Sequence, residues 1–130
     1  GEKVRFSVLC DILDACGDEL PVWSGNDDLT VPLLSLGAKG VISVLSNVRP
    51  KRTLQMVRAC QAGDYAAAGR MQVALTPLID ALFSEINPIP VKQALSLMGI
   101  PAGLPRLPLT PLSATHLPAL EQALSAVPEP

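Results

Sequence analysis

Aromatic and charged side chains are both scarce in this chain of 130 residues. Only 3% of the residues are aromatic, so the chain offers no stacking surface of the kind that single-stranded nucleic acids need. Charged residues make up 17% of the chain, and the net charge is −2 at pH 7. This weak negative charge argues against binding to nucleic acids or to anionic membrane surfaces. We therefore expect neither nucleic acid nor membrane as a partner.

Long apolar runs are also missing. No run approaches the roughly 20 residues that a membrane-spanning helix requires. The first residues, GEKVRFSVLC, contain neither the apolar core nor the small-residue cleavage site of a secretion signal. They also lack an initiator methionine, so we expect the chain to begin either at a cut or at an artificial boundary. A cytoplasmic location is the expectation that follows.

Metal-binding and cofactor-binding patterns are absent as well. Cys10, Cys16 and Cys60 show no C-x-x-C spacing, which favours buried or half-buried thiols in a reducing compartment over metal or redox chemistry. The single histidine, His116, has no cysteine or carboxylate beside it in sequence, so we assign it a surface or packing role. Neither glycine pattern of phosphate-binding loops occurs. The sequence thus predicts no metal and no cofactor.

The first part of the chain alternates between helix and strand patterns. Apolar residues at helical spacing indicate helices, and β-branched apolar residues without alternation are typical of a strand buried on both faces. Glycine ends helices, and aspartate caps their first turn. We expect a helix at 3–15 that ends at Gly17, a strand at 20–24, a turn at 25–26, a helix that is capped by Asp27 or Asp28 and ends near 36, and a strand at 40–46.

The remainder of the chain predicts helices separated by proline-rich breaks. Proline suits the first turn of a helix, and a proline further inside removes a backbone hydrogen bond. We expect helices at 50–61, at 65–83 with a cap at Asp64 and a kink or interruption near Pro77, at 90–99 after the NPIP hinge, and from Ser113 or Thr115 to near the final ALSAVPEP, residues 123–130, with an irregular proline-rich segment at 100–113.

This order of elements predicts an α/β fold class with a helical tail. Alternating strands and helices give a parallel sheet, but two parallel strands can neither close a sheet nor cover its edges. A complete (β/α)8 barrel takes about 250 residues. If the two strands are barrel strands, the chain is therefore part of a larger barrel.

Four segments carry more specific information. They are, in order, SGNDD, GAKGVISVLSN, EINPIPVKQALSLMG and RLPLTPLS. Each is weak alone, but together they resemble the C-terminal half of the dihydrodipicolinate synthase family over nearly the whole chain. The resemblance implies a (β/α)8 TIM barrel whose last two strands, the seventh and eighth, are 20–24 and 40–46. It divides the chain into barrel βα units at 1–62 and a C-terminal α-helical extension at 63–130.

The resemblance also implies an activity. The family condenses pyruvate with aspartate semialdehyde on the route to diaminopimelate and lysine, through a Schiff base between pyruvate and a lysine on the sixth strand. That lysine, the proton-relay tyrosine, the threonine pair and the lysine-feedback site would all lie upstream of residue 1. We therefore expect no catalytic residue in this chain and no activity of the chain alone. The resemblance further implies a homotetramer.

Family site residues can be transferred where the motifs match. The Ser-Gly-Asp-Asp turn after the family's seventh strand becomes Ser24, Gly25, Asn26 and Asp27, with Asn26 in place of the first acid. The main-chain contact to pyruvate from the eighth strand falls on Ile42. These positions follow barrel strands at their carboxyl ends, where barrel active sites form. The resemblance thus implies that Gly25, Asn26, Asp27 and Ile42 bind substrate.

The remaining charged residues are interpreted as structural. Lys39 precedes a strand, at the end away from the catalytic face, and Lys92 lies in the first turn of a helix, so we expect neither to form the Schiff base. Asp27 and Asp28 are interpreted as helix caps rather than a catalytic acid pair. A basic cluster is interpreted as a solvated helix face, with contact to an anion as the alternative; its members are Arg49, Lys51, Arg52 and Arg58.

Two other functions stay open at this point. Sialic-acid lyases and keto-acid aldolases share the barrel and the Schiff base, although SGNDD and NPIPVK favour the synthase. A non-catalytic helical interaction module is the third hypothesis, and it predicts cooperative folding of the chain at this length.

Overall fold

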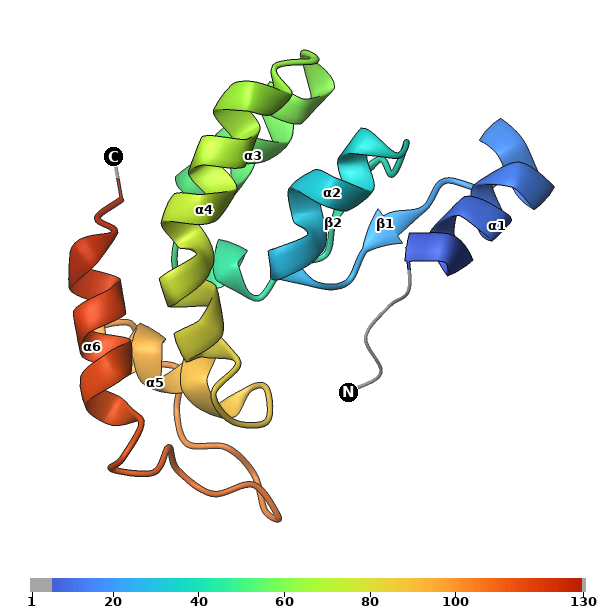
Figure 1. Cartoon of the computed structure of the whole chain (residues 1–130). Coiled ribbons are helices and arrows are strands. Elements are labelled where there is room, and N and C mark those ends of the chain that lie inside the picture. Colours follow the sequence, from blue (N-terminus) through green and yellow to red (C-terminus); the bar gives the residue numbers. More distant parts are fainter. Residues whose placement is uncertain (1–5, 130) are drawn as a thin grey trace.

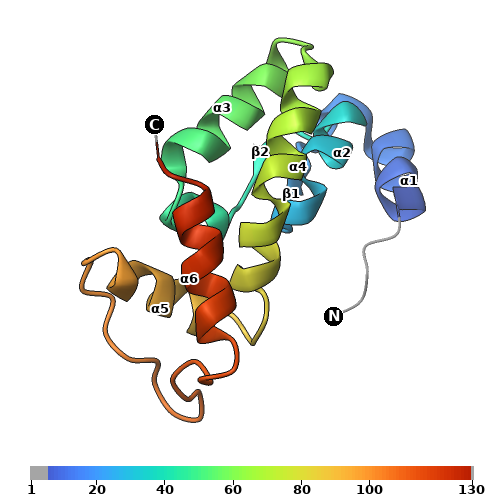
Figure 2. The same cartoon turned by 60° about the vertical axis from the view of Figure 1, so that its left-hand side comes forward.

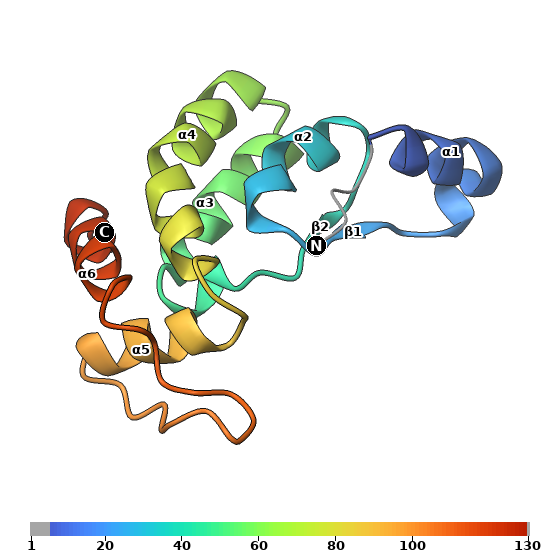
Figure 3. The ribbon, with the colours of Figure 1, turned by 60° about the horizontal axis from the view of Figure 1, so that its bottom comes forward.

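Residues 6–129 are described by a computed structural model, drawn as a ribbon in Figure 1. The elements are α1 (Phe6–Cys16), η1 (Gly17–Glu19), β1 (Trp23–Ser24), η2 (Asp27–Leu29), α2 (Thr30–Ser35), β2 (Gly40–Val41), η3 (Leu45–Asn47), α3 (Pro50–Gln61), α4 (Tyr65–Leu82), α5 (Ile89–Leu97) and α6 (Leu117–Ala126), where η denotes a 3-10 helix. α1 and α6 lie at opposite ends of the molecule, with α2, α3 and α4 between them (Figures 1 and 3). The expected start of the first helix, residues 3–5, lies outside the described residues.

The two strands form a parallel pair, as the helix–strand alternation predicts. Trp23 pairs with Gly40, and Ser24 pairs with Val41. A Cβ atom on Gly40 would lie 2.4 Å from the Trp23 ring. Because Gly40 has no side chain, the Trp23 ring in β1 can lie directly against the backbone of β2.

Both strands are shorter than the sequence predicts. The strand expected at 20–24 keeps only its last two residues, and the strand expected at 40–46 keeps only its first two. A strand needs a neighbour along its length, and within residues 6–129 each strand has only the other. The second strand also ends early because the backbone turns into η3 at Leu45. The expected strand lengths were therefore wrong.

Most helix ends follow the local signals in the sequence. α1 is followed by Gly17 with φ +53, in the left-handed region that glycine favours. The cap at Asp64 is confirmed, because its carboxylate accepts a hydrogen bond from the Ala67 N–H at 2.9 Å. α6 begins at Leu117, later than expected, after a turn in which Ser113 bonds to Glu85.

α4 continues through Pro77 as one helix. Of the kink or interruption expected near Pro77, the interruption is therefore absent. Proline removes the hydrogen bond to the carbonyl four residues earlier, which belongs to Val73. Val73 is 73% exposed, so water can reach this part of the helix. The missing backbone bond is tolerated because it falls on the solvent side.

One apolar core joins the barrel part to the extension. Leu45, Val48 and Met56 precede or belong to α3, and they pack with buried residues of α4, α5 and α6. Figure 2 shows α6 lying along α4, with α5 beside their lower ends. The proposed domain boundary at 62/63 falls between α3 and α4 and stays a prediction. A second cluster lies under α1 and α2; its buried members are Leu9, Leu33, Leu34, Ala38, Cys60 and Ala68.

The three cysteines are free thiols. Cys16 is half-buried and Cys60 buried, as expected, but Cys10 is exposed because Leu9 is the only described residue of α1 that is buried. Burial raises the pKa of the Cys60 thiol. Within residues 6–129, no group of three or more His, Cys, Asp or Glu side chains could hold a metal ion. No helix in the described part of the chain is long and apolar enough to cross a membrane.

Candidate functional site

The candidate site is formed by two loops at the carboxyl ends of the parallel strands. The first loop, residues 24–27, begins at the last residue of β1, and the second, residues 42–45, follows β2. The Ile42 N–H donates to the Ser24 carbonyl at 2.8 Å, which joins the loops where they leave the strands. Because parallel strands point the same way, both loops open on the same edge of the sheet.

Asp27 ties the first loop to the second. Its side chain is buried, with 1% of the residue exposed. One carboxylate oxygen accepts from the N–H groups of Val44 and Leu45, both at 2.9 Å, and the other accepts from the Ser43 hydroxyl. A carboxylate in such a place is stable because every buried oxygen has a donor.

The structure corrects the role that the sequence suggested for the two aspartates. Neither η2 nor α2 has a side-chain cap at its N-terminus. Asp27 instead binds the turn that leads into η3, and Asp28 is exposed to solvent. Asp27 also differs from the other expected substrate contacts, since its carboxylate is occupied by the chain's own donors.

The rest of the first loop is held by a serine turn. Ser24 is buried, and its hydroxyl donates to the Asn26 carbonyl at 2.8 Å and accepts from the Asn26 N–H at 3.2 Å. Gly25 is exposed and Asn26 half-buried. In the second loop, 75% of Ile42 is exposed. Gly25, Asn26 and Ile42 are therefore the expected site residues that a ligand can reach.

Two residues of this network were missed by the sequence reasoning. Ser43 follows Ile42 and gave no signal of its own. Gln72 lies in α4, and its amide donates to the Asp27 carbonyl at 3.0 Å and accepts from the Val31 N–H at 3.2 Å. A signal for Gln72 did exist, because it stands among apolar residues on the buried face of its helix; these are Ala68, Leu75 and Ile79.

The two lysines considered for a Schiff base lie elsewhere. Lys39 is exposed and immediately precedes β2, at the amino end of the strand. Lys92 is half-buried in α5, and its ammonium group donates to the Ala102 carbonyl. This bond fixes the start of the proline-rich segment, so a structural role for Lys92 is confirmed.

The basic cluster is not simply a solvated helix face. Arg49 is 6% exposed, and its guanidinium donates to the carbonyls of Val48 and Leu124, each at 2.6 Å, and to that of Val127. Carbonyls at the end of a helix lack partners within it and attract cations, which explains the contact with α6. Burial lowers the pKa of Arg49, and nearby Arg52 adds to this while Glu129 opposes it.

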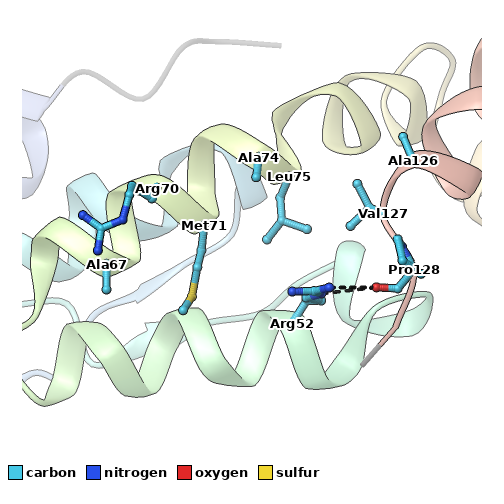
Figure 4. A pocket seen from close by; sticks show the side chains of 9 residues that line it. All are labelled: Arg52, Ala67, Arg70, Met71, Ala74, Leu75, Ala126, Val127 and Pro128. Carbon is cyan, nitrogen blue, oxygen red and sulfur yellow. Dashed lines mark hydrogen bonds between the residues drawn. The ribbon is translucent and has the colours of Figure 1, made fainter.

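A cavity of about 350 Å³ lies between α3, α4 and the segment that follows α6. Figure 4 shows its lining from close by. Arg52 donates to the Pro128 carbonyl at 3.2 Å along one wall. The other lining residues are Ala67, Arg70, Met71, Ala74, Leu75, Ala126 and Val127. The cavity shares no residue with the two strand-end loops.

His116 has a carboxylate partner that sequence distance concealed. Glu85 Oε1 accepts from the Ser113 hydroxyl at 2.6 Å and from the Ser113 N–H at 3.0 Å, and it lies 2.8 Å from His116 Nδ1. These hydrogen bonds, the serine's first, lower the pKa of Glu85 to about 2. Ser113 and Glu85 both approach the same ring nitrogen, whereas a nucleophilic triad uses both nitrogens. Glu85, Ser113 and His116 therefore form a structural hydrogen-bonded cluster, called the clasp below.

Comparison with known proteins decides the family. The model of the dihydrodipicolinate synthetase family matches residues 3–127. The chain belongs to this family. It is 46% identical over 123 residues to the 4-hydroxy-tetrahydrodipicolinate synthase of Acetivibrio thermocellus, covering 95% of this chain and 42% of that protein. The corresponding synthase of Exiguobacterium is 47% identical over 121 residues, covering 90% of this chain and 41% of that protein.

Solved structures of the family agree with the fold. Dihydrodipicolinate synthase from Aquifex aeolicus superposes with a TM-score of 0.90 at 37% identity, covering 96% of this chain and 43% of that chain. The enzyme from Thermotoga maritima superposes with a TM-score of 0.83 at 42% identity, covering 89% of this chain and 39% of that chain. The chain thus spans about two fifths of the length of these relatives. The expected fold class is confirmed: the last two strands of a TIM barrel with a C-terminal helical extension.

Proposed function

We propose that this chain forms one side of the pyruvate site of a 4-hydroxy-tetrahydrodipicolinate synthase, a lyase of lysine and diaminopimelate biosynthesis. One observation carries the proposal. Within a chain of this family, Asp27 joins the loops at the carboxyl ends of two parallel strands, the edge at which barrel enzymes hold their substrates. Pyruvate and aspartate semialdehyde are the proposed substrates.

The chemistry begins on a lysine outside this chain. Its amine adds to the ketone of pyruvate, water leaves, and the resulting Schiff base loses a C3 proton to give an enamine. The enamine carbon then attacks the aldehyde carbon of aspartate semialdehyde, whose oxygen takes up a proton. Within the present chain, Gly25, Asn26 and Ile42 contact the pyruvate part of this intermediate.

Asp27 supports those contacts without touching the substrate. Its carboxylate is occupied by Ser43, Val44 and Leu45, so its part is to hold the two loops at a fixed separation. Asn26 is neutral, whereas the family resemblance implies an acid at this position. Replacing that charge by an amide lowers the electrostatic repulsion of an anionic substrate at this edge.

Substrate choice and assembly are parts of the same proposal. Several similar curated relatives carry the synthase name, which favours the synthase over other pyruvate-dependent aldolases. We propose that the protein with a complete barrel is a cytoplasmic homotetramer. One solved relative is described as a monomeric variant. The chain alone lacks the lysine and is inactive.

A fusion protein tests this function. Residues 1–130 are joined to the upstream portion of the Acetivibrio thermocellus synthase, which completes the barrel; we call this protein the completed enzyme. We expect condensation of pyruvate with aspartate semialdehyde by the completed enzyme, and none by the upstream portion or by residues 1–130 alone. Purification and circular dichroism verify that the fusion is folded. A folded fusion that does not turn over these substrates would contradict the proposal.

A further inference from the structure

Gln72 connects the helical extension to the barrel loops. It lies in α4, and only 8% of the residue is exposed. Its Nε2 donates to the Asp27 carbonyl at 3.0 Å, and its Oε1 accepts from the Val31 N–H at 3.2 Å. One buried amide therefore links Asp27, the last residue of the first strand-end loop, to Val31 in the first turn of α2.

Asp27 binds both Gln72 and the second loop. Its main-chain carbonyl is held by Gln72 and by the Thr30 hydroxyl, at 3.0 Å each. Its side chain holds the N–H groups of Val44 and Leu45. The position of both loops against each other thus depends on where α4 places the Gln72 amide.

We propose that Gln72 is a positioning residue through which the extension sets the geometry of the pyruvate site. The inference rests on the proposed function. A leucine at this position has a similar size and suits a helix, but it offers neither donor nor acceptor. The Val31 N–H would then lose its partner, and the Asp27 carbonyl would keep only Thr30. The first loop would be free to move away from its place over pyruvate.

Kinetics of the completed enzyme test the proposal. In Gln72→Leu, we expect the KM for pyruvate to rise about tenfold, equivalent to ~1.4 kcal/mol, while kcat stays within about twofold. Gln55→Leu is the matched control, because it makes the same chemical change at an exposed position of α3. Measurements are made well below the unfolding temperature of each variant. An unchanged KM in Gln72→Leu, or an equal rise in Gln55→Leu, overturns the proposal.

Gln72→Glu provides a second, independent readout. A protonated carboxyl group can donate to the Asp27 carbonyl and accept from the Val31 N–H, as the amide does, whereas a carboxylate can only accept. We therefore expect the ratio of its pyruvate KM to that of the unsubstituted enzyme to fall as the pH is lowered. A ratio that does not change with pH overturns the proposal. This result decides the question even if Gln72→Leu does not fold.

The two proposals fail in different ways. If the unsubstituted completed enzyme folds but does not bind pyruvate, the proposed function fails. Hydrogen exchange then still tests the positioning, because Gln72→Leu should speed exchange at the amides of Val31 and Leu45, and Gln55→Leu should not. If the enzyme is active and neither KM nor exchange responds at Gln72, only the positioning role fails.

Discussion

At the scale of single residues, two neighbouring aspartates have different roles. Asp27 is buried and binds three donors from residues 43–45, whereas Asp28 is exposed. The sequence shows both beside a predicted helix start, where a local cap is the simplest interpretation. Asp27's partners lie 16 to 18 positions further on, and such a distance leaves no mark in the spacing of the residues.

Asp27→Asn tests the importance of this carboxylate. An amide presents a donor as well as an acceptor, so it opposes one of the donors that now meet the carboxylate. We expect the completed enzyme to lose about 2–4 kcal/mol of unfolding free energy, measured by urea denaturation. Asp28→Asn is the control, with an expected change below about 0.5 kcal/mol because the side chain is exposed. Equal effects of the two substitutions would show that the buried network contributes nothing.

At the scale of elements, the clasp of Glu85, Ser113 and His116 joins the end of α4 to the start of α6. The hydrogen bonds from Ser113 and His116 favour the charged form of Glu85 and lower its pKa from 4.5 to about 2. The folded protein therefore binds this proton less tightly than the unfolded chain does. The resulting stabilisation is present above pH 4.5 and is lost as the pH falls towards 2.

Glu85→Gln removes this dependence on pH. Compared with the unsubstituted completed enzyme, the variant should unfold at a lower urea concentration at pH about 5.5, and the difference should shrink at pH about 3. Glu121→Gln, at an exposed position of α6, should show no such convergence. A difference that stays constant or widens towards acid would refute the clasp as the source of the stabilisation.

Element boundaries were predictable where their signals are local. The helix stop at Gly17, the cap at Asp64 and the first turn at Pro50 each depend on one or two neighbouring residues, and the structure has all three. Strand lengths and the start of α6 were wrong, because they depend on partners distant in sequence. Ser113, for example, bonds to Glu85 instead of opening a helix.

At the scale of the whole molecule, the sheet exposes surface that a barrel would cover. Trp23 in β1 is 54% exposed. Each strand has one neighbour within residues 6–129, whereas every strand of a closed barrel has two. The turn at 24–27 and the contact at Ile42 could be assigned from family resemblance, but Ser43 and the Gln72 bridge from the extension required the folded arrangement.

Borohydride trapping with pyruvate tests the central claim most directly. Reduction makes a Schiff base permanent, and mass spectrometry of peptides then identifies the lysine that formed it. We expect no adduct on residues 1–130 alone, and an adduct in the completed enzyme that maps to a lysine upstream of residue 1. An adduct on Lys39 or Lys92 would refute the proposed site of the Schiff base.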